Sequence, residues 1–97
     1  MSSMIVKNNN DGKKGFFAAM EDDEEAGQMT FTFAGEDRLI VDHTEVNPDF
    51  KGQGVGKLML MNLVDFARKN QYKVIPLCPF AKSVFSKEEK IRDVLFT

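Results

Sequence analysis

The sequence predicts a small α+β fold in which an antiparallel sheet is followed by a helix, a strand and a second helix. Residues 28–34 alternate apolar and polar side chains strictly, which is typical of a strand with one buried face. Residues 38–46 are rich in β-branched side chains, and a Gly-Glu-Asp turn separates the two segments. From residue 56 to 69 the apolar side chains recur every three or four positions, as on the buried face of a helix.

Shorter strands are expected ahead of this pair. Residues 4–7 are apolar enough for an opening strand, and the Asn, Asp and Gly of residues 8–12 indicate a turn. Residues 15–20 then predict a second strand, and the acidic block 21–25 predicts a solvated hairpin tip. The first half of the chain is therefore expected to be an antiparallel meander of strands joined by tight turns.

The helix over residues 56–69 is expected to carry an ion pair between Asp65 and Lys69 on its outer face. Asn70 is a residue type that tolerates the left-handed conformation in which many helices stop. Residues 72–77 then predict a short strand.

Pro79 suits the first turn of a second helix because its missing N–H would have no partner there. Phe80 and Val84 lie one turn apart and are expected on the inner face of that helix. A charged break at residues 87–90 precedes a final segment, residues 91–96. The predicted order is β-β-β-β-α-β-α, within a single domain over residues 1–97.

Composition and charge exclude several classes of protein. The chain has 97 residues, a net charge of −2 and only one histidine and one cysteine. A weakly acidic chain with scattered basic residues is not expected to bind nucleic acid or anionic lipid. One histidine and one cysteine do not make a metal site, so no metal is expected. The segment Met1–Val6 lacks the apolar stretch of a signal peptide, which predicts a cytoplasmic protein. The protein is expected to be a monomer or a weak dimer.

A glycine-rich turn at residues 51–56 lies between the strongest strand and the strongest helix. Its three glycines permit close approach of the backbone to a ligand, and the helix that follows adds unpaired N–H groups and the positive end of its dipole. Lys51 and Lys57 add positive charge on either side. The turn therefore predicts a site for an anion, and its width favours a diphosphate.

Two common nucleotide motifs do not fit this turn. The P-loop pattern fails because Lys51 occupies its first glycine position and Leu58 replaces its hydroxyl residue. The Rossmann pattern, counted from Gly52, has Lys57 at its last glycine position. The strand before the turn also follows a meander and not a parallel βαβ unit.

The run Lys51-Gly52-Gln53-Gly54-Val55-Gly56 resembles the acetyl-coenzyme A motif of the GNAT N-acetyltransferase superfamily, [RQ]-x-x-G-x-[GA], with Lys51 in place of Arg or Gln. The segments Asp42-His43-Thr44-Glu45-Val46 and Val74-Ile75-Pro76-Leu77-Cys78-Pro79-Phe80 are similar to those of a short GNAT-like family. That family lacks the usual N-terminal helices, and the resemblance covers most of residues 28–90.

The resemblance implies that acetyl-coenzyme A is the cosubstrate. Its pyrophosphate would bind at residues 51–57, and its pantetheine arm would lie between residues 44–46 and residues 76–78. The coenzyme-binding residues implied in this way are Thr44, Glu45, Val46, Lys51, Gly52, Gln53, Gly54, Val55, Gly56, Lys57, Cys78 and Phe80.

Three residues are candidates for catalysis. If Pro79 starts a helix, Cys78 lies at its N-terminus, where the dipole favours a thiolate that could accept the acetyl group or protonate the departing coenzyme. An inert buried cysteine is the alternative. His43, or Glu45 on the same strand face, could act as general base. Tyr72 lies at the wrong end of its strand to serve as the acid that many GNAT enzymes use.

The first functional hypothesis is an N-acetyltransferase that modifies an amine, such as a protein lysine, a chain N-terminus or a polyamine. The alternative is a module that binds coenzyme A or an acyl-coenzyme A with little or no transfer. A small protein-interaction domain with an incidental turn is the third interpretation.

Overall fold

The computed structural model describes residues 4–97, and Met1–Ser3 of the N-terminal segment discussed above lie outside them. The described chain contains five strands, two α-helices and two short 3-10 helices, and the predicted order β-β-β-β-α-β-α is confirmed. The elements are β1 (Met4–Asn10), β2 (Lys14–Glu21), β3 (Glu24–Ala34), β4 (Arg38–Val46), η1 (Pro48–Phe50), α1 (Val55–Asn70), β5 (Lys73–Pro76), α2 (Pro79–Lys87) and η2 (Glu89–Val94).

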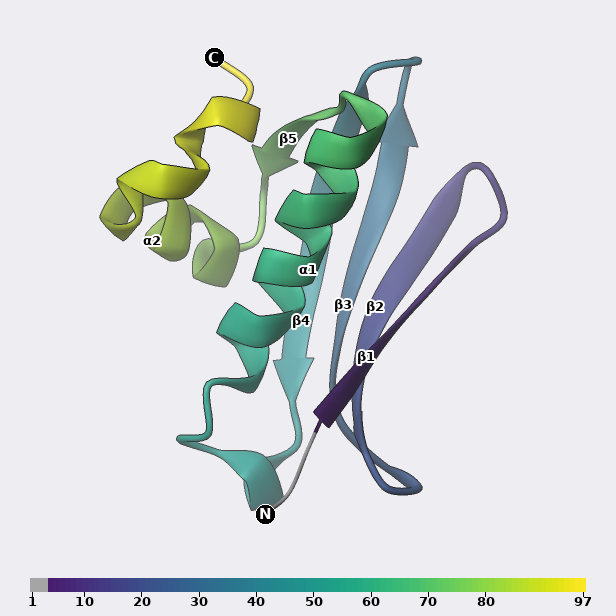
Figure 1. Cartoon of the computed structure of the whole chain (residues 1–97), viewed down its shortest axis with the longest axis vertical. Coiled ribbons are helices and arrows are strands. Elements are labelled where there is room, and N and C mark those ends of the chain that lie inside the picture. Colours follow the sequence, from purple (N-terminus) through teal and green to yellow (C-terminus); the bar gives the residue numbers. More distant parts are fainter. Residues whose placement is uncertain (1–3) are drawn as a thin grey trace.

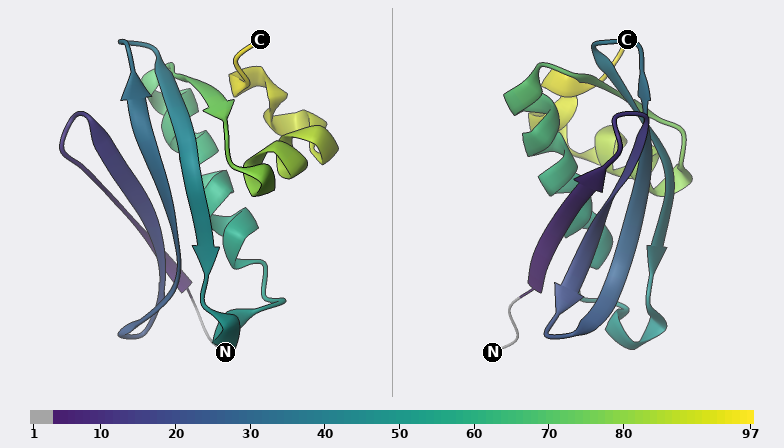
Figure 2. Two further views of the ribbon diagram at one scale, coloured as in Figure 1. Left: turned by 180° about the vertical axis from the view of Figure 1, so that it is seen from behind. Right: turned by 90° about the vertical axis from the view of Figure 1, so that its right-hand side faces the viewer.

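The strands form one mixed sheet in the order β1-β2-β3-β4-β5. Strands β1 to β4 are an antiparallel meander, as predicted, and β5 pairs with β4 in parallel after the crossover through α1. Helix α1 crosses one face of the sheet. Helices α2 and η2 lie beside α1, beyond the edge of the sheet that β5 forms (Figures 1 and 2). A parallel neighbour requires such a crossover, because a tight turn can join only antiparallel strands.

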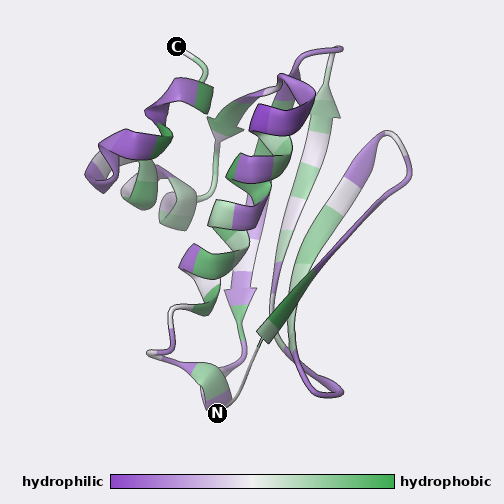
Figure 3. Ribbon diagram, viewed as in Figure 1, coloured by the Kyte–Doolittle hydropathy of each residue, from purple (hydrophilic) through white to green (hydrophobic). Residues whose placement is uncertain are grey.

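The core lies between α1 and the sheet. Apolar and polar residues alternate along α1 (Figure 3). Its buried residues are Val55, Gly56, Met59, Leu60, Leu63, Val64 and Ala67. They pack on Phe17, Met29, Phe31, Leu39 and Val41 of the sheet, and on buried residues of α2 and η2. This burial, more than local helix propensity, holds α1 in place.

The first turn of α1 comes very close to the sheet at Gly27 of β3. A Cβ at Gly27 would lie 2.8 Å from the carbonyl oxygen of Glu45 and 2.9 Å from Cγ1 of Val55. Because no side chain fits there, glycine lets the glycine-rich turn sit directly at the end of β4.

Strand β4 contains a bulge that decides which way its last residues face. Thr30 of β3 lies opposite His43, but Phe31 lies opposite Val41, so Asp42 is an extra residue in β4. Its carboxylate accepts a hydrogen bond of 2.6 Å from the hydroxyl of Thr32. One extra residue exchanges the two faces for everything after it.

Several predicted boundaries differ in the first half of the chain. Asn8, Asn9 and Asn10 belong to β1 and not to a turn, because they pair with residues 15–17 of β2. Glu24 and Glu25 belong to β3 for a similar reason, which leaves only Asp22 and Asp23 at the tip. Strand pairing overrides the weak strand preference of these polar residues.

In the second half, helix α1 continues through Asn70, and Gln71 takes the left-handed conformation with φ of 61°. The ion pair on the outer face joins Asp65 to Arg68 at 3.8 Å and not to Lys69. Strand β5 is two residues shorter than expected.

Helix α2 begins at Pro79 as predicted, but its inner face differs from the prediction. Ala81, Val84 and Phe85 are buried, whereas Phe80 is 37% exposed. The segment after α2 forms the 3-10 helix η2, in which Arg92 donates hydrogen bonds to the Phe85 and Ser86 carbonyls. These bonds satisfy carbonyl groups that the helix end leaves free.

The C-terminal segment is tied to α1 by charged groups. The Arg68 guanidinium donates two hydrogen bonds, 2.9 and 2.7 Å long, to the Asp93 carboxylate. They hold the pKa of Asp93 below its usual range.

Within residues 4–97, no helix has the length and apolar character needed to cross a membrane.

Candidate functional site

The glycine-rich turn leaves the start of α1 without a side-chain cap. Gly54 is the N-cap residue, with φ of 74°, and it has no side chain that could accept from the first N–H groups of the helix. Gly52 also has a positive φ, 84°. A Cβ at either position would meet nothing within 4 Å, so the space in front of the turn is open. Free N–H groups at an open helix N-terminus favour an anion.

The third glycine of the motif has a different task. A Cβ at Gly56 would lie 2.7 Å from Cζ of the Phe80 ring, which belongs to α2. Gly56 therefore allows α2 to approach the first turn of α1. As a result, Phe80 lies beside the turn with part of its ring exposed.

Strands β4 and β5 separate at Val41, immediately before the bulge. Their pairing covers residues 38–41 of β4 and 73–76 of β5. The Val41 carbonyl accepts hydrogen bonds from the N–H groups of both Leu77 (3.1 Å) and Cys78 (3.2 Å), and the chain then turns into α2. Within residues 4–97, no strand pairs with residues 42–46 on that side of β4. Such a free edge presents N–H and C=O groups to a ligand that lies along it.

Cys78 lies where the two strands separate. It is the N-cap of α2, as predicted, and its sulfur accepts a hydrogen bond from the Ala81 N–H at 3.3 Å. The same sulfur lies 3.2 Å from the hydroxyl oxygen of Thr44 on β4. Cys78 is 4% exposed. The Thr44–Cys78 contact therefore connects the free end of β4 to the start of α2.

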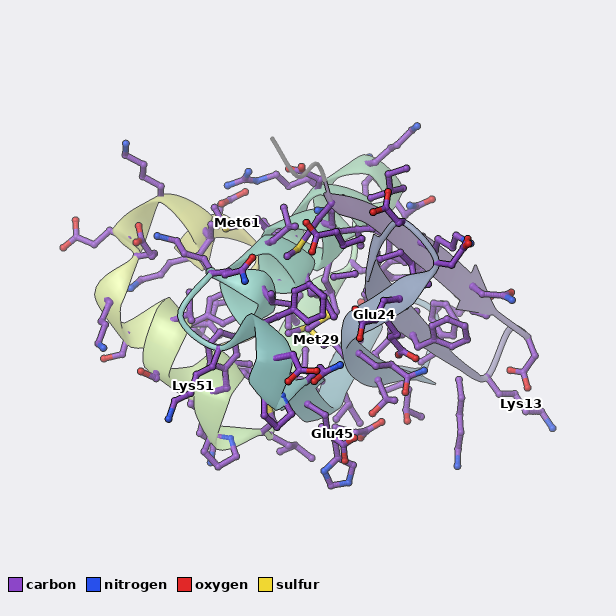
Figure 4. All side chains as sticks on the ribbon, turned by 90° about the horizontal axis from the view of Figure 1, so that it is seen from below. Lys13, Glu24, Met29, Glu45, Lys51 and Met61 are labelled. Atoms are coloured by element: carbon purple, nitrogen blue, oxygen red, sulfur yellow. The ribbon has the colours of Figure 1, made fainter. Side chains whose placement is uncertain are left out.

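The bulge places the other candidate residues on the opposite face of the sheet. Thr44 lies across from Met29, which is fully buried under α1. His43 lies across from Thr30, and Glu45 across from Gln28, so both point away from α1. Seen along the sheet, Met29 lies inside the molecule and Glu45 projects outward (Figure 4). The structure thus brings Thr44 to Cys78, and it does not bring His43 or Glu45 to that sulfur.

Two hollows adjoin the site. One, of about 310 Å³, lies at the end of β4 and is lined by Glu25, Gly27, Gln28, Glu45, Val46, Asn47 and Pro48. The other, of about 210 Å³, lies between α1 and α2 and is lined by Lys57, Phe80, Val84, Lys87 and Glu88.

Lysines lie on both sides of the turn. Lys51 is exposed at the turn (Figure 4). Lys57 donates a hydrogen bond of 2.8 Å to the Glu88 carboxylate, which lowers the pKa of Glu88. Sequence reasoning missed this pairing because it joins residues far apart in the chain. Thr44 is among the predicted coenzyme-binding residues, but the contact of its side chain with Cys78 was not predicted, because it depends on the bulge.

Strands β1 to β4 form a meander, a glycine-rich turn and helix α1 follow it, and β5 separates from β4 after Val41. This arrangement is that of the acyl-coenzyme A N-acyltransferase folds. The chain matches the family model described as GCN5-related N-acetyl-transferase over residues 15–94. It therefore belongs to this family, as the motif at residues 51–56 indicates.

Solved structures agree with this assignment. A GCN5-like N-acetyltransferase candidate from Staphylococcus aureus shares 32% identity over 93% of this chain and 87% of its own, with a TM-score of 0.69. A GNAT family acetyltransferase from Elizabethkingia anophelis, solved with acetyl-CoA bound, has a TM-score of 0.69 at 12% identity, over 87% of this chain and 72% of its own.

A ribosomal-protein-alanine N-acetyltransferase from Brucella melitensis biovar Abortus 2308 has a TM-score of 0.65 at 22% identity, over 90% of this chain and 64% of its own. The last two likenesses show the fold alone. No curated protein matches the sequence.

Proposed function

We propose that this protein is an N-acetyltransferase that takes its acetyl group from acetyl-coenzyme A. The proposal rests on one observation. The uncapped, open N-terminus of α1 at Gly54 follows the end of β4, and residues 42–46 of β4 are unpaired on the side toward β5. A diphosphate and an amide-containing arm are the ligand parts that these two features suit. The acetyl-coenzyme A bound to the Elizabethkingia protein supports the choice of ligand.

In this proposal the pyrophosphate contacts backbone N–H groups of Gly52 and of residues 54–57, with Lys51 and Lys57 nearby, while the Gln53 N–H donates to the Phe50 carbonyl. Phe80 borders the same turn through its contact with Gly56. The pantetheine arm lies along the free edge at Thr44, Glu45 and Val46. Its thioester then ends near the point where β5 leaves β4, which is where Cys78 lies.

Cys78 is the proposed acetyl acceptor. Its sulfur attacks the thioester carbonyl, a new bond forms between that carbon and sulfur, and the coenzyme departs as a thiol. The amine then attacks the enzyme-bound thioester and releases the Cys78 thiol. The Ala81 N–H on the sulfur and the N-terminal end of α2 support this role, since both stabilise negative charge there.

The amine is proposed to arrive from the face that carries His43 and Glu45. On that face Glu25 and Glu45 line the larger hollow, and within residues 4–97 neither forms a salt bridge. Carboxylates attract a protonated amine, and His43, two residues before Glu45 on the same face of β4, is the proposed base that removes its proton. A cytoplasmic location is also part of the proposal, because a single free thiol suits a reducing compartment.

Calorimetric titration with acetyl-coenzyme A tests binding, and saturable binding of one molecule per chain is expected. Intact-mass measurement after mixing tests the covalent step, with an acetyl adduct expected on the wild type and none on Cys78→Ala. Release of free coenzyme thiol with spermidine, a lysine peptide and a free N-terminal peptide tests transfer. Binding without adduct or transfer would leave a coenzyme-binding module, and absence of binding would refute both functions.

A further inference from the structure

The sulfur of Cys78 has two polar contacts within residues 4–97, and the two differ in kind. The Ala81 N–H, 3.3 Å away, is a donor only. The Thr44 hydroxyl, 3.2 Å away, can either donate or accept. When Cys78 is a thiol, its hydrogen therefore has one partner able to receive it, which is the oxygen of Thr44.

Among residues 4–97, no titratable side chain takes that place. His43 and Glu45 lie on the other face of the sheet, as their register with Thr30 and Gln28 shows. Tyr72 precedes β5, and its ring packs against those of Phe33 and Phe66, with centroids 5.6 and 5.8 Å away. Because Cys78 is almost fully buried, bulk water does not replace these groups.

We propose that Thr44 is a catalytic residue that carries the proton of Cys78. This inference rests on the proposed function, in which the sulfur takes the acetyl group. As the bond between the Cys78 sulfur and the acetyl carbon forms, the thiol proton moves to the Thr44 oxygen. The hydroxyl proton of Thr44 passes at the same time to the departing coenzyme sulfur, which leaves as a thiol. Thr44 ends the step as a hydroxyl again, so no proton is gained or lost.

The relay also supplies a proton to the departing coenzyme sulfur. A thiolate leaving group needs a proton donor, and among the described residues no tyrosine stands at the splayed strands. The bulge at Asp42 is what turns Thr44 toward the sulfur, since without it His43 would share the face of Val41. The bulge and the hydroxyl thus form one arrangement.

The first test observes the thiol without any coenzyme. The chain has one cysteine, so its infrared spectrum contains a single S–H stretching band. Thr44→Val should move this band toward the frequency of an unbonded thiol, and Thr44→Ser should leave it near the wild-type position. Thr30→Val is the matched control, because Thr30 is also half-buried but lies on the opposite face from Thr44. A band that does not move in Thr44→Val overturns the proposal.

The second test measures the rate at which acetyl-coenzyme A forms the Cys78 adduct, at saturating coenzyme. Thr44→Val should slow it by about 100-fold, the usual scale of a lost proton-transfer group. Thr44→Ser should restore most of the rate, and Thr30→Val should leave it unchanged. Equal rates in wild type and Thr44→Val would overturn the relay.

A different result would count against the proposed function alone. If the wild type binds acetyl-coenzyme A but forms no adduct, the covalent step fails. The rate of iodoacetamide alkylation then decides the role of Thr44. A rate that falls in Thr44→Val and is restored in Thr44→Ser supports proton transfer through the hydroxyl, and equal rates overturn it.

Discussion

The Cβ that Gly56 lacks would lie 2.7 Å from Cζ of the Phe80 ring, which makes this glycine a packing residue between α1 and α2. Gly56→Ala should therefore displace the ring or separate the two helices. We expect a loss of about 1–3 kcal/mol in the free energy of unfolding, the usual cost of overpacking. Urea unfolding followed by circular dichroism measures it.

The double variant Gly56→Ala with Phe80→Leu provides the control, because the smaller side chain relieves the clash. The two substitutions should be less destabilising together than the sum of each alone. Strict additivity would show that the two residues do not share one contact.

The turn glycines should behave differently. Gly54 has φ of 74° and Gly35, in the turn between β3 and β4, has φ of 71°, and a Cβ at either meets nothing within 4 Å. Alanine at either position should cost about 1–2 kcal/mol of stability, because both require the left-handed conformation. Only Gly54→Ala should also weaken coenzyme binding, since its methyl group projects into the space in front of the turn.

Calorimetric titration of the two variants at a temperature where both are folded separates the effects. If Gly35→Ala loses as much affinity as Gly54→Ala, backbone strain and not blocked approach explains the loss.

Acid should weaken the attachment of the C-terminal segment. The hydrogen bonds from Arg68 hold the pKa of Asp93 below its ordinary value of 3.8. A carboxyl whose pKa is lower in the folded state contributes stability above its ordinary value, and that contribution is lost as the pH falls through the folded pKa. The unfolding temperature should therefore fall more steeply with acid in the wild type than in Arg68→Gln.

Lys69→Gln is the matched control for that comparison, because it removes the same charge from the neighbouring exposed position. It should retain the wild-type acid slope. A slope that is the same in all three proteins would contradict a role for the Arg68–Asp93 pair.

His43 and Cys78 should be separable by kinetics. His43→Gln removes the proposed base on the amine face without touching the sulfur. Transfer to the amine should fall by about 100-fold, while formation of the acetyl adduct on Cys78 keeps its rate. Single-turnover mass spectrometry with and without amine measures both steps, and equal slowing of the two would place His43 in the first step.

Much of the fold is readable from the sequence because the strongest patterns coincide with burial. The alternation of residues 28–34 and the apolar residues spaced three or four apart in α1 each reflect one buried face of the element. The weaker elements are not readable in the same way. Asn8 to Asn10 form a strand because β2 offers them partners, which no local pattern reveals.

In the site, too, the features that depend on local sequence could be predicted and those that depend on strand pairing could not. The turn at residues 51–56 is a local motif, and the position of Cys78 at the start of α2 follows from Pro79. The bulge at Asp42 is not local, because the pairing of β3 with β4 creates it. Because the sequence does not reveal the bulge, it predicts neither the contact of Thr44 with Cys78 nor the separation of His43 from that sulfur.

The extra residue at Asp42 has a consequence for how inhibitors would act. In the proposed reaction, coenzyme and amine occupy opposite sides of the sheet and meet only where β5 leaves β4. An inert cation held beside Glu45 would thus leave the Thr44 edge free, and coenzyme would bind without competition. A compound that competes with both substrates would need to reach across the sheet where β4 and β5 separate.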